Sequence, residues 1–121
     1  MVEVPSREIA VVDDDAAVLD SFRFMLELAG FRVATYPSAG AFLGSGRIRP
    51  RCLILDQYMP LMTGLELTAR LRADKIDIPV MLITSAPSPA IATRAAALGI
   101  ECVLEKPPSE DDLIRFIASC G

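Results

Sequence analysis

Short apolar runs alternate along the chain with segments in which apolar positions recur every three or four residues. The runs are rich in valine, isoleucine and leucine, and three of them are almost continuously apolar, which is typical of strands covered on both faces. The five runs are 9–13 (IAVVD), 31–36 (FRVATY), 52–56 (CLILD), 79–84 (PVMLIT) and 101–106 (ECVLEK). We therefore expect five strands, most of them buried.

The segments between these runs have the spacing of amphipathic helices. In 16–29, Val18, Phe22, Met25 and Ala29 are separated by four, three and four residues, which predicts that they form the buried face of one helix. Chemical signals for helix ends accompany the pattern. They are an N-cap at Ser88 before Pro89, a capping box from Ser109 to Asp112, and C-terminal glycines at Gly30 and Gly99.

The strand–helix alternation, repeated five times, predicts an α/β fold in which a parallel sheet is covered by helices and joined by right-handed crossovers. The chain has 121 residues, of which 52% are hydrophobic and 23% charged. This length and composition suit one domain over residues 1–121 with a core of its own. The pattern therefore predicts a single doubly wound domain.

Several classes of protein are disfavoured by composition. The apolar runs are far shorter than the roughly 20 residues that a membrane-spanning helix needs, and the N-terminus does not resemble an export signal, so we expect a soluble, cytoplasmic protein. The net charge of -4 argues against direct contact with nucleic acid. The chain has three cysteines without metal-site spacing and no histidine, which favours buried free thiols over a disulfide or a transition-metal site.

Polar residues follow the predicted strands where the apolar runs end. Asp13–Asp15 end the first run, Asp56 the third, Thr84 the fourth and Lys106 the fifth. Because the carboxyl ends of parallel strands meet at one edge of a sheet, where ligands bind in open α/β folds, we expect these side chains to converge.

Such a set has a specific chemistry. Crowded carboxylates repel one another, and a hard divalent cation such as Mg²⁺ with oxygen ligands relieves the repulsion. A carboxylate is also a nucleophile that can form an aspartyl-phosphate, and the Lys106 ammonium and Thr84 hydroxyl suit the remaining phosphoryl oxygens. Taken singly, these residues would be ordinary turn or capping residues. Their joint placement at the strand ends favours a binding site.

The motifs "VVDDD", "LILDQYMPLMTGLEL", "VMLITS" and "LEKP", in this order, resemble the receiver domain of two-component response regulators, and most of all the FixJ-like group. The resemblance runs from about Ile9 to Ile117. It implies the flavodoxin-like, CheY-like (βα)5 fold with a five-stranded sheet in the order 2-1-3-4-5. It also implies a signalling domain, not an enzyme in the ordinary sense.

The resemblance assigns roles to the residues at the predicted edge. Asp56 would be the phosphoacceptor, Thr84 the hydroxyl that moves toward the phosphoryl group, and Lys106 its partner ammonium. Asp15 would cap a helix or contact the metal through water. The Mg²⁺ ligands would be Asp13, Asp14, Asp56 and the backbone carbonyl of Tyr58.

Two positions depart from the family pattern. Many receivers have an aromatic residue three positions before the lysine, which swings inward when the threonine moves, whereas this chain has Val103. The usual threonine–aromatic switch is therefore in question. Tyr58, two positions beyond Asp56, is bulky for its place, and we expect it to shield the phosphoryl group.

These observations predict a receiver that accepts a phosphoryl group from a histidine kinase on Asp56 with Mg²⁺. The region 88–118 would then act in homodimerisation or partner binding. No output domain is expected after Gly121. The alternative is a receiver-fold interaction module that works without phosphorylation. A phosphatase with an aspartate nucleophile fits less well, because Tyr58 stands where that class has its second carboxylate.

Overall fold

The computed structural model describes residues 8–120, which form a five-stranded parallel sheet in the order β2-β1-β3-β4-β5. The strands are β1 (Ile9–Val12), β2 (Val33–Tyr36), β3 (Cys52–Asp56), β4 (Val80–Thr84) and β5 (Cys102–Glu105). The helices are α1 (Ala16–Leu28), α2 (Ala39–Gly44), α3 (Gly64–Ala73), α4 (Pro89–Ala97) and α5 (Glu110–Ser119). Both the alternation and the strand order expected from the sequence are confirmed.

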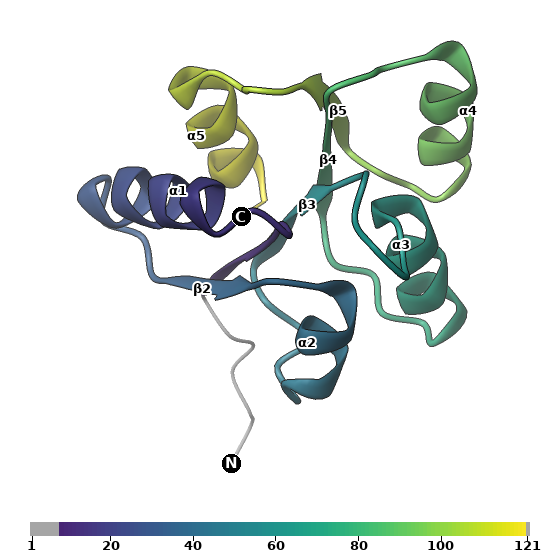
Figure 1. Ribbon diagram of the computed structural model, residues 1–121, viewed down its shortest axis with the longest axis horizontal. Coiled ribbons are helices and arrows are strands. Elements are labelled where there is room, and N and C mark those ends of the chain that lie inside the picture. The colour runs from purple at the N-terminus through teal and green to yellow at the C-terminus, as the bar shows by residue number, and fades with distance from the viewer. Residues whose placement is uncertain (1–7, 121) are drawn as a thin grey trace.

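The sheet separates two apolar layers. Helices α1 and α5 cover one face, and α2, α3 and α4 cover the other (Figure 1). Successive strand residues alternate between the layers: Val11 and Ile54 pack with α1 and α5, while Val12 and Leu55 pack with the other three helices. This two-sided burial explains why β1, β3 and β4 are continuously apolar in sequence.

The element boundaries lie close to those expected, with one error in a helix face. Strands β1 and β5 end one residue earlier than their apolar runs, so Asp13 and Lys106 are the first residues beyond them. The buried stripe of α1 consists of Leu19, Phe22 and Leu26. Of the predicted face, Phe22 is buried, and Val18 and Met25 are half-buried against the same core layer. Only Ala29 was wrong: it is exposed, because the helix lies on the sheet rotated toward Leu19.

The expected helix ends are largely confirmed. Ser88 and Ser109 are N-caps whose hydroxyls accept backbone hydrogen bonds, and Gly30 and Gly99 have positive φ after their helices. The Asp112 carboxylate, which the predicted capping box would place on the Ser109 backbone N–H, instead lies 3.8 Å from Arg115. A full capping box forms instead at the start of α3, a helix end that the sequence reasoning did not single out.

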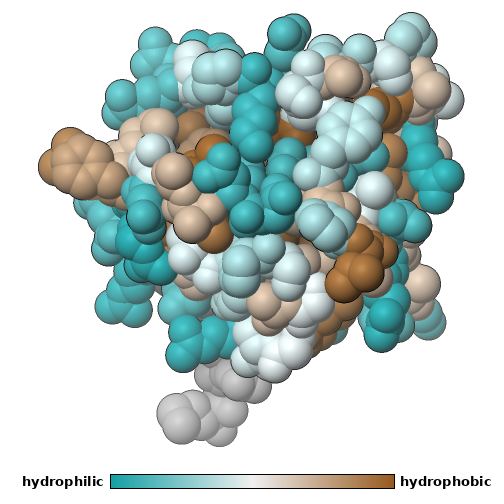
Figure 2. All heavy atoms as spheres, viewed as in Figure 1, coloured by the Kyte–Doolittle hydropathy of each residue, from teal (hydrophilic) through white to brown (hydrophobic). Residues whose placement is uncertain are grey.

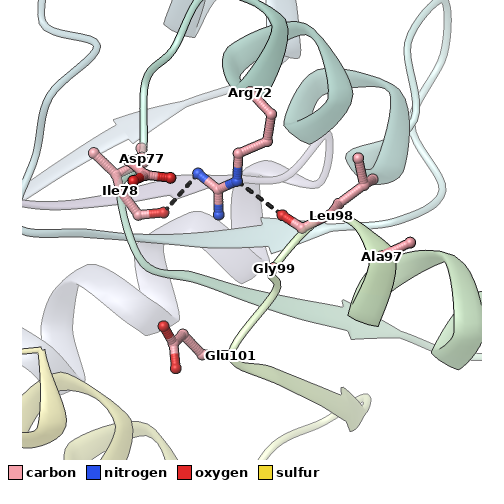
Figure 3. A pocket seen from close by; sticks show the side chains of 7 residues that line it. All are labelled: Arg72, Asp77, Ile78, Ala97, Leu98, Gly99 and Glu101. Carbon is pink, nitrogen blue, oxygen red and sulfur yellow. Dashed lines mark hydrogen bonds between the residues drawn. The ribbon is translucent and has the colours of Figure 1, made fainter.

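Arg72 joins elements at the amino-terminal end of the sheet, away from the predicted site. Its guanidinium donates to the carbonyls of Leu98 and Ile78 at 2.8 and 2.9 Å (Figure 3). It also donates to the Ile76 carbonyl at 3.0 Å. One side chain thereby ties the end of α4 to the connection before β4. Within residues 8–120, no helix has the length and apolar character needed to cross a membrane.

Candidate functional site

The register of β1 and β3 brings the first two predicted carboxylates together. Val12 pairs with Leu55 in the parallel ladder, so Asp13 and Asp56 are the next residues on adjacent strands. Because side chains alternate along a strand, both carboxylates point to the face opposite Val12 and Leu55, toward α1 and α5. Asp13 is 2% exposed and Asp56 is 6% exposed, so both are buried.

Asp14 completes an acidic cluster at this edge. One carboxylate oxygen from each of Asp13, Asp14 and Asp56 lies within 4.8 Å of the other two. Asp13 Oδ1 accepts a hydrogen bond of 2.9 Å from the backbone N–H of Asp15, which fixes the orientation of the Asp13 carboxylate. Asp15 itself caps α1, because its carboxylate accepts from the N–H groups of Ala17 and Val18. This is one of the two roles that we expected for Asp15.

Lys106 brings positive charge to the cluster from the end of β5. Its ammonium donates to Asp13 Oδ2 at 2.9 Å and lies 3.7 Å from Asp56 Oδ2. The backbone N–H of Lys106 donates to the Thr84 carbonyl at 2.9 Å, and the following peptide bond to Pro107 is cis. The lysine thus reaches the carboxylates across the end of β4.

The charges at this edge shift the pKa values of their neighbours. Burial raises the pKa of Asp56 to about 6, the charge of Asp13 adds to the rise, and Lys106 opposes it. Partial burial by itself lowers the pKa of Lys106, but the hydrogen bond and the charge of Asp13 outweigh it, so the pKa is raised. The cluster therefore disfavours the ionised form of Asp56 and favours the charged form of Lys106.

The other predicted site residues lie around this cluster with different degrees of contact. Thr84 is fully buried, and its hydroxyl accepts from the Ala86 N–H at 3.1 Å and contacts none of the three carboxylates. The Tyr58 side chain is 51% exposed, beside the site. Val103 is half-buried and packs against the core layer that contains α4.

Two further residues matter here that sequence reasoning missed. At Gly64, the first residue of α3, an added Cβ would lie 2.6 Å from the Asp56 carbonyl oxygen and 2.6 Å from Leu82 Cδ1, so only glycine allows α3 to begin this close to β3. Gln57 is a buried amide directly after Asp56. The two residues stand in the sequence as part of "DQ" and "TGLE", but these motifs do not reveal their contacts, which arise only in the folded structure.

The donor set of the cluster fits a magnesium ion. All three side chains offer carboxylate oxygens, the ligands that hard divalent cations prefer, and their spacing allows a shared ion. The raised pKa of Asp56 also reflects negative charge that a cation would compensate. Asp14 is exposed, which leaves the cluster open to solvent and to a phosphoryl donor.

Comparison with known proteins agrees with this geometry. The model of the response regulator receiver domain matches residues 9–118. The chain belongs to this family. Its receiver domain is 38% identical over 112 residues to the transcriptional regulatory protein FixJ of Bradyrhizobium diazoefficiens, covering 92% of this chain and 55% of that protein. It is 36% identical to the response regulator protein TmoT of Ectopseudomonas mendocina, covering 90% of this chain and 50% of that protein.

Solved receiver structures share the fold. The crystal structure of FixJ-N superposes with a TM-score of 0.84 at 33% identity, covering 97% of this chain and 94% of that chain. The chemotaxis protein CheY4 of Vibrio cholerae superposes with a TM-score of 0.84 at 24% identity, covering 96% and 99%, and shares the fold. The receiver described here spans about half the length of the curated relatives it matches.

The pKa of Asp56 predicts that Asp56→Asn stabilises the metal-free protein. Because the folded-state pKa of about 6 lies above the ordinary aspartate value of 3.8, ionisation of Asp56 destabilises the fold, and the penalty grows as pH rises through this window. We expect a gain of roughly 2–3 kcal/mol at pH 7.5 in EDTA, or roughly 5–10 °C in Tm. At pH 4.5 the gain should fall to less than half. Thermal unfolding at both pH values measures it.

Asp77→Asn is the matched control for this measurement, since Asp77 is exposed and lies at the other end of the sheet. Its effect should stay within about 0.5 kcal/mol at either pH. A wild-type protein as stable as Asp56→Asn at pH 7.5 would show that the buried carboxylate carries no such penalty.

Proposed function

We propose that this receiver domain accepts a phosphoryl group from a histidine kinase on Asp56, with Mg²⁺ held by Asp13, Asp14, Asp56 and the Tyr58 carbonyl. The observation that supports it most is the convergence of three carboxylates and the Lys106 ammonium at one edge of the sheet. Membership of the receiver family, whose model matches residues 9–118, also supports the proposal.

The transfer follows from the chemistry of these groups. A carboxylate oxygen of Asp56 attacks phosphorus, the P–N bond of the kinase phosphohistidine breaks, and the imidazole keeps the electron pair and takes up a proton. The chain has no histidine, so it offers no competing imidazole acceptor. At neutral pH, above the pKa of about 6, Asp56 is mostly ionised and able to attack.

Lys106 and Thr84 complete the site after transfer. Bound Mg²⁺ would supply positive charge to the phosphoryl oxygens. Lys106, which lies 3.7 Å from Asp56 Oδ2, can exchange its contact with Asp13 for one with a phosphoryl oxygen. Thr84, at the end of β4, can donate its hydroxyl hydrogen to a phosphoryl oxygen, because its bond with Ala86 uses the hydroxyl oxygen only as an acceptor. Tyr58, half-exposed beside Asp56, shields the phosphoryl group from water.

The kinase docks on α1 in this proposal, because a phosphohistidine can reach Asp56 only from a surface that adjoins it. An apolar groove of about 280 Å³ lies between α1 and residues 106–108, and Lys106 is part of its lining. Phe24 and Leu28, one helical turn apart on the same helix, are 70% and 78% exposed. Figure 2 shows apolar surface at the left edge, where Figure 1 places α1.

The output surface in this proposal is the region 88–118, which comprises α4, β5 and α5. Thr84 ends the strand that precedes it, so a shift of the Thr84 hydroxyl reaches this region directly. The exposed side of α4 carries the short side chains of Ala92, Ala96 and Ala97, which allow another copy of the chain to approach closely. We place this signalling in the cytoplasm, which fits the three free cysteines.

A receiver-fold interaction module that works without phosphorylation is the competing function. Val103 in place of an aromatic residue is the feature that favours it. The acidic cluster and Lys106 argue against it, because three adjacent carboxylates are costly to keep in a protein that makes no use of their charge. We therefore favour phosphorylation.

Incubation with acetyl phosphate and Mg²⁺ should add one phosphoryl group to the protein. Intact mass measurement should show the addition in the wild type and in the control Asp77→Asn, whose carboxylate lies at the other end of the sheet. Asp56→Asn should show none, because it lacks the nucleophile. EDTA should abolish the reaction. Persistence of the addition in Asp56→Asn, or no addition with any donor, would contradict the proposal.

Replacement of Phe24 and Leu28 by serine should slow phosphoryl transfer from the kinase and leave the chemistry at Asp56 intact. We expect the Phe24→Ser/Leu28→Ser variant to accept phosphate from a cognate kinase at least about tenfold more slowly, a loss of about 1.4 kcal/mol in transfer. Its reaction with acetyl phosphate should be unchanged, since that donor needs no docking surface. Ala96→Ser/Ala97→Ser on α4 is the control and should behave as wild type. Equal kinase rates in all three proteins would place docking elsewhere.

Beryllofluoride, a phosphoryl mimic, should shift the receiver toward a dimer. Light scattering with and without the mimic measures the change, and Thr93→Arg, which places a large charge on the exposed side of α4, should prevent it. An unchanged oligomeric state together with an unchanged affinity for partners would instead favour the interaction module.

A further inference from the structure

Gln57 is a buried polar residue, next to Asp56 in the chain, that the proposed chemistry does not use. It lies between Asp56, the phosphoacceptor, and Tyr58, whose carbonyl is assigned to Mg²⁺. It is 6% exposed, as buried as Asp56 itself. A buried amide is stable only where its hydrogen-bonding groups find partners, so its contacts define its role.

Three hydrogen bonds connect Gln57 to the elements on either side. Its N–H donates to the Ile83 carbonyl of β4 at 2.9 Å. Its carbonyl accepts from the Gly64 N–H at 3.0 Å, and its side-chain Oε1 accepts from the Leu65 N–H at 2.9 Å. Gln57 therefore fastens the end of β3 both to the neighbouring strand and to the first turn of α3.

The first turn of α3 is capped from two different places. The first N–H groups of a helix have no partner within it. Those of Gly64 and Leu65 donate to Gln57, whereas that of Glu66 donates to the Thr63 hydroxyl at 3.2 Å. Thr63 belongs to the loop before the helix. Gln57 belongs to the strand that carries the phosphoacceptor, so its bonds fix the helix relative to Asp56.

The loop of residues 58–63, which joins Gln57 to α3, is strained and keeps its conformation only if its two ends are held in place. Leu61 has φ 71°, a left-handed conformation that a non-glycine residue adopts at a cost, and the Met62 N–H donates to the Pro60 carbonyl at 2.8 Å in a tight turn. The loop contains Tyr58, so the position of its carbonyl depends on where the loop starts and ends. Close contact of Gly64 with the Asp56 carbonyl leaves little space for a shifted helix.

We propose that Gln57 is a positioning residue: its side-chain amide holds the 58–63 loop in the geometry that places the Tyr58 carbonyl and the Asp56 carboxylate around one Mg²⁺. This inference rests on the proposed function, since it concerns the ion that the proposal assigns to the site. The amide acts through the loop and does not touch the ion. Residues that orient metal ligands typically change metal affinity by about 10–100-fold when they are removed.

Gln57→Met tests this role, because methionine keeps the length of the side chain and lacks the oxygen that accepts from Leu65. Calorimetric titration of Mg²⁺ should give a Kd about tenfold weaker than that of the wild type. In the metal-free protein, the Leu65 amide should exchange faster with solvent in NMR. Gln57→Glu keeps an acceptor oxygen and should bind Mg²⁺ no more weakly than the wild type.

Thr63→Ala is the matched control. It removes a hydrogen bond from the same turn of α3, but one made from the loop and not from the strand. Both variants should lower Tm, and only Gln57→Met should weaken Mg²⁺ binding beyond about twofold. If Gln57→Met fails to fold, Gln57→Asn, whose amide is too short to reach Leu65, replaces it with the same expectation.

The outcomes separate this inference from the proposed function. Wild-type protein that neither binds Mg²⁺ nor accepts phosphate contradicts both. Wild-type protein that does so, with a Gln57→Met variant that binds Mg²⁺ equally well, overturns the positioning role alone. Equal weakening in Gln57→Met and Thr63→Ala would likewise overturn it, because loss of either helix cap would then suffice.

Discussion

Repulsion among three carboxylates is the constraint around which this receiver is arranged. Asp13 and Asp56 lie at the ends of adjacent, in-register strands, so they cannot separate unless the sheet is broken. Carboxylates this close together in a buried place repel one another, so opposite charge or protonation must offset the repulsion. Lys106 does so from beyond β5, in contact with Asp13 and near Asp56, and still leaves the pKa of Asp56 raised. An acidic cluster that remains under-compensated has affinity for a divalent cation and for what that cation binds.

The same edge of the sheet is rigid where the chemistry requires it. Asp15 caps α1 immediately after the acidic pair, and α3 begins against the Asp56 carbonyl, where only a glycine fits. Gln57 holds that helix to the strand that ends in Asp56. The strained turn at Leu61 is thereby enclosed between fixed ends, which keeps the Tyr58 carbonyl in one place. Rigid surroundings of this kind reduce the entropy cost of assembling a metal site.

Two surfaces that the proposed function uses lie next to this site. The apolar groove along α1 includes Lys106 and therefore adjoins the site directly. The α4–β5–α5 region follows Thr84, the last residue of β4. At the far end of the sheet, Arg72 holds the connections of α3, α4 and β4 together. Because these bonds hold the amino-terminal end of the sheet, we expect a change of charge at the site to move elements at the carboxyl edge only.

The sequence by itself determined the architecture and most of the site. Continuous apolar runs, helix caps and the placement of Asp13, Asp14, Asp56, Thr84 and Lys106 at strand ends are local patterns, and the topology of parallel strands converts them into one edge. The face of α1 was predicted only approximately, because helical spacing allows neighbouring stripes and only packing on the sheet selects Leu19 and Leu26 as its buried centre.

The tertiary structure alone decided the contacts between distant segments. The pairing of Lys106 with Asp13, the raised pKa of Asp56 and the hold of Gln57 on α3 all join groups whose distance depends on the assembled sheet. A glutamine after an aspartate carries no signal of its own in sequence. Its role appears only when folding buries it beside unpaired helix N–H groups, because burial is what makes each hydrogen bond obligatory.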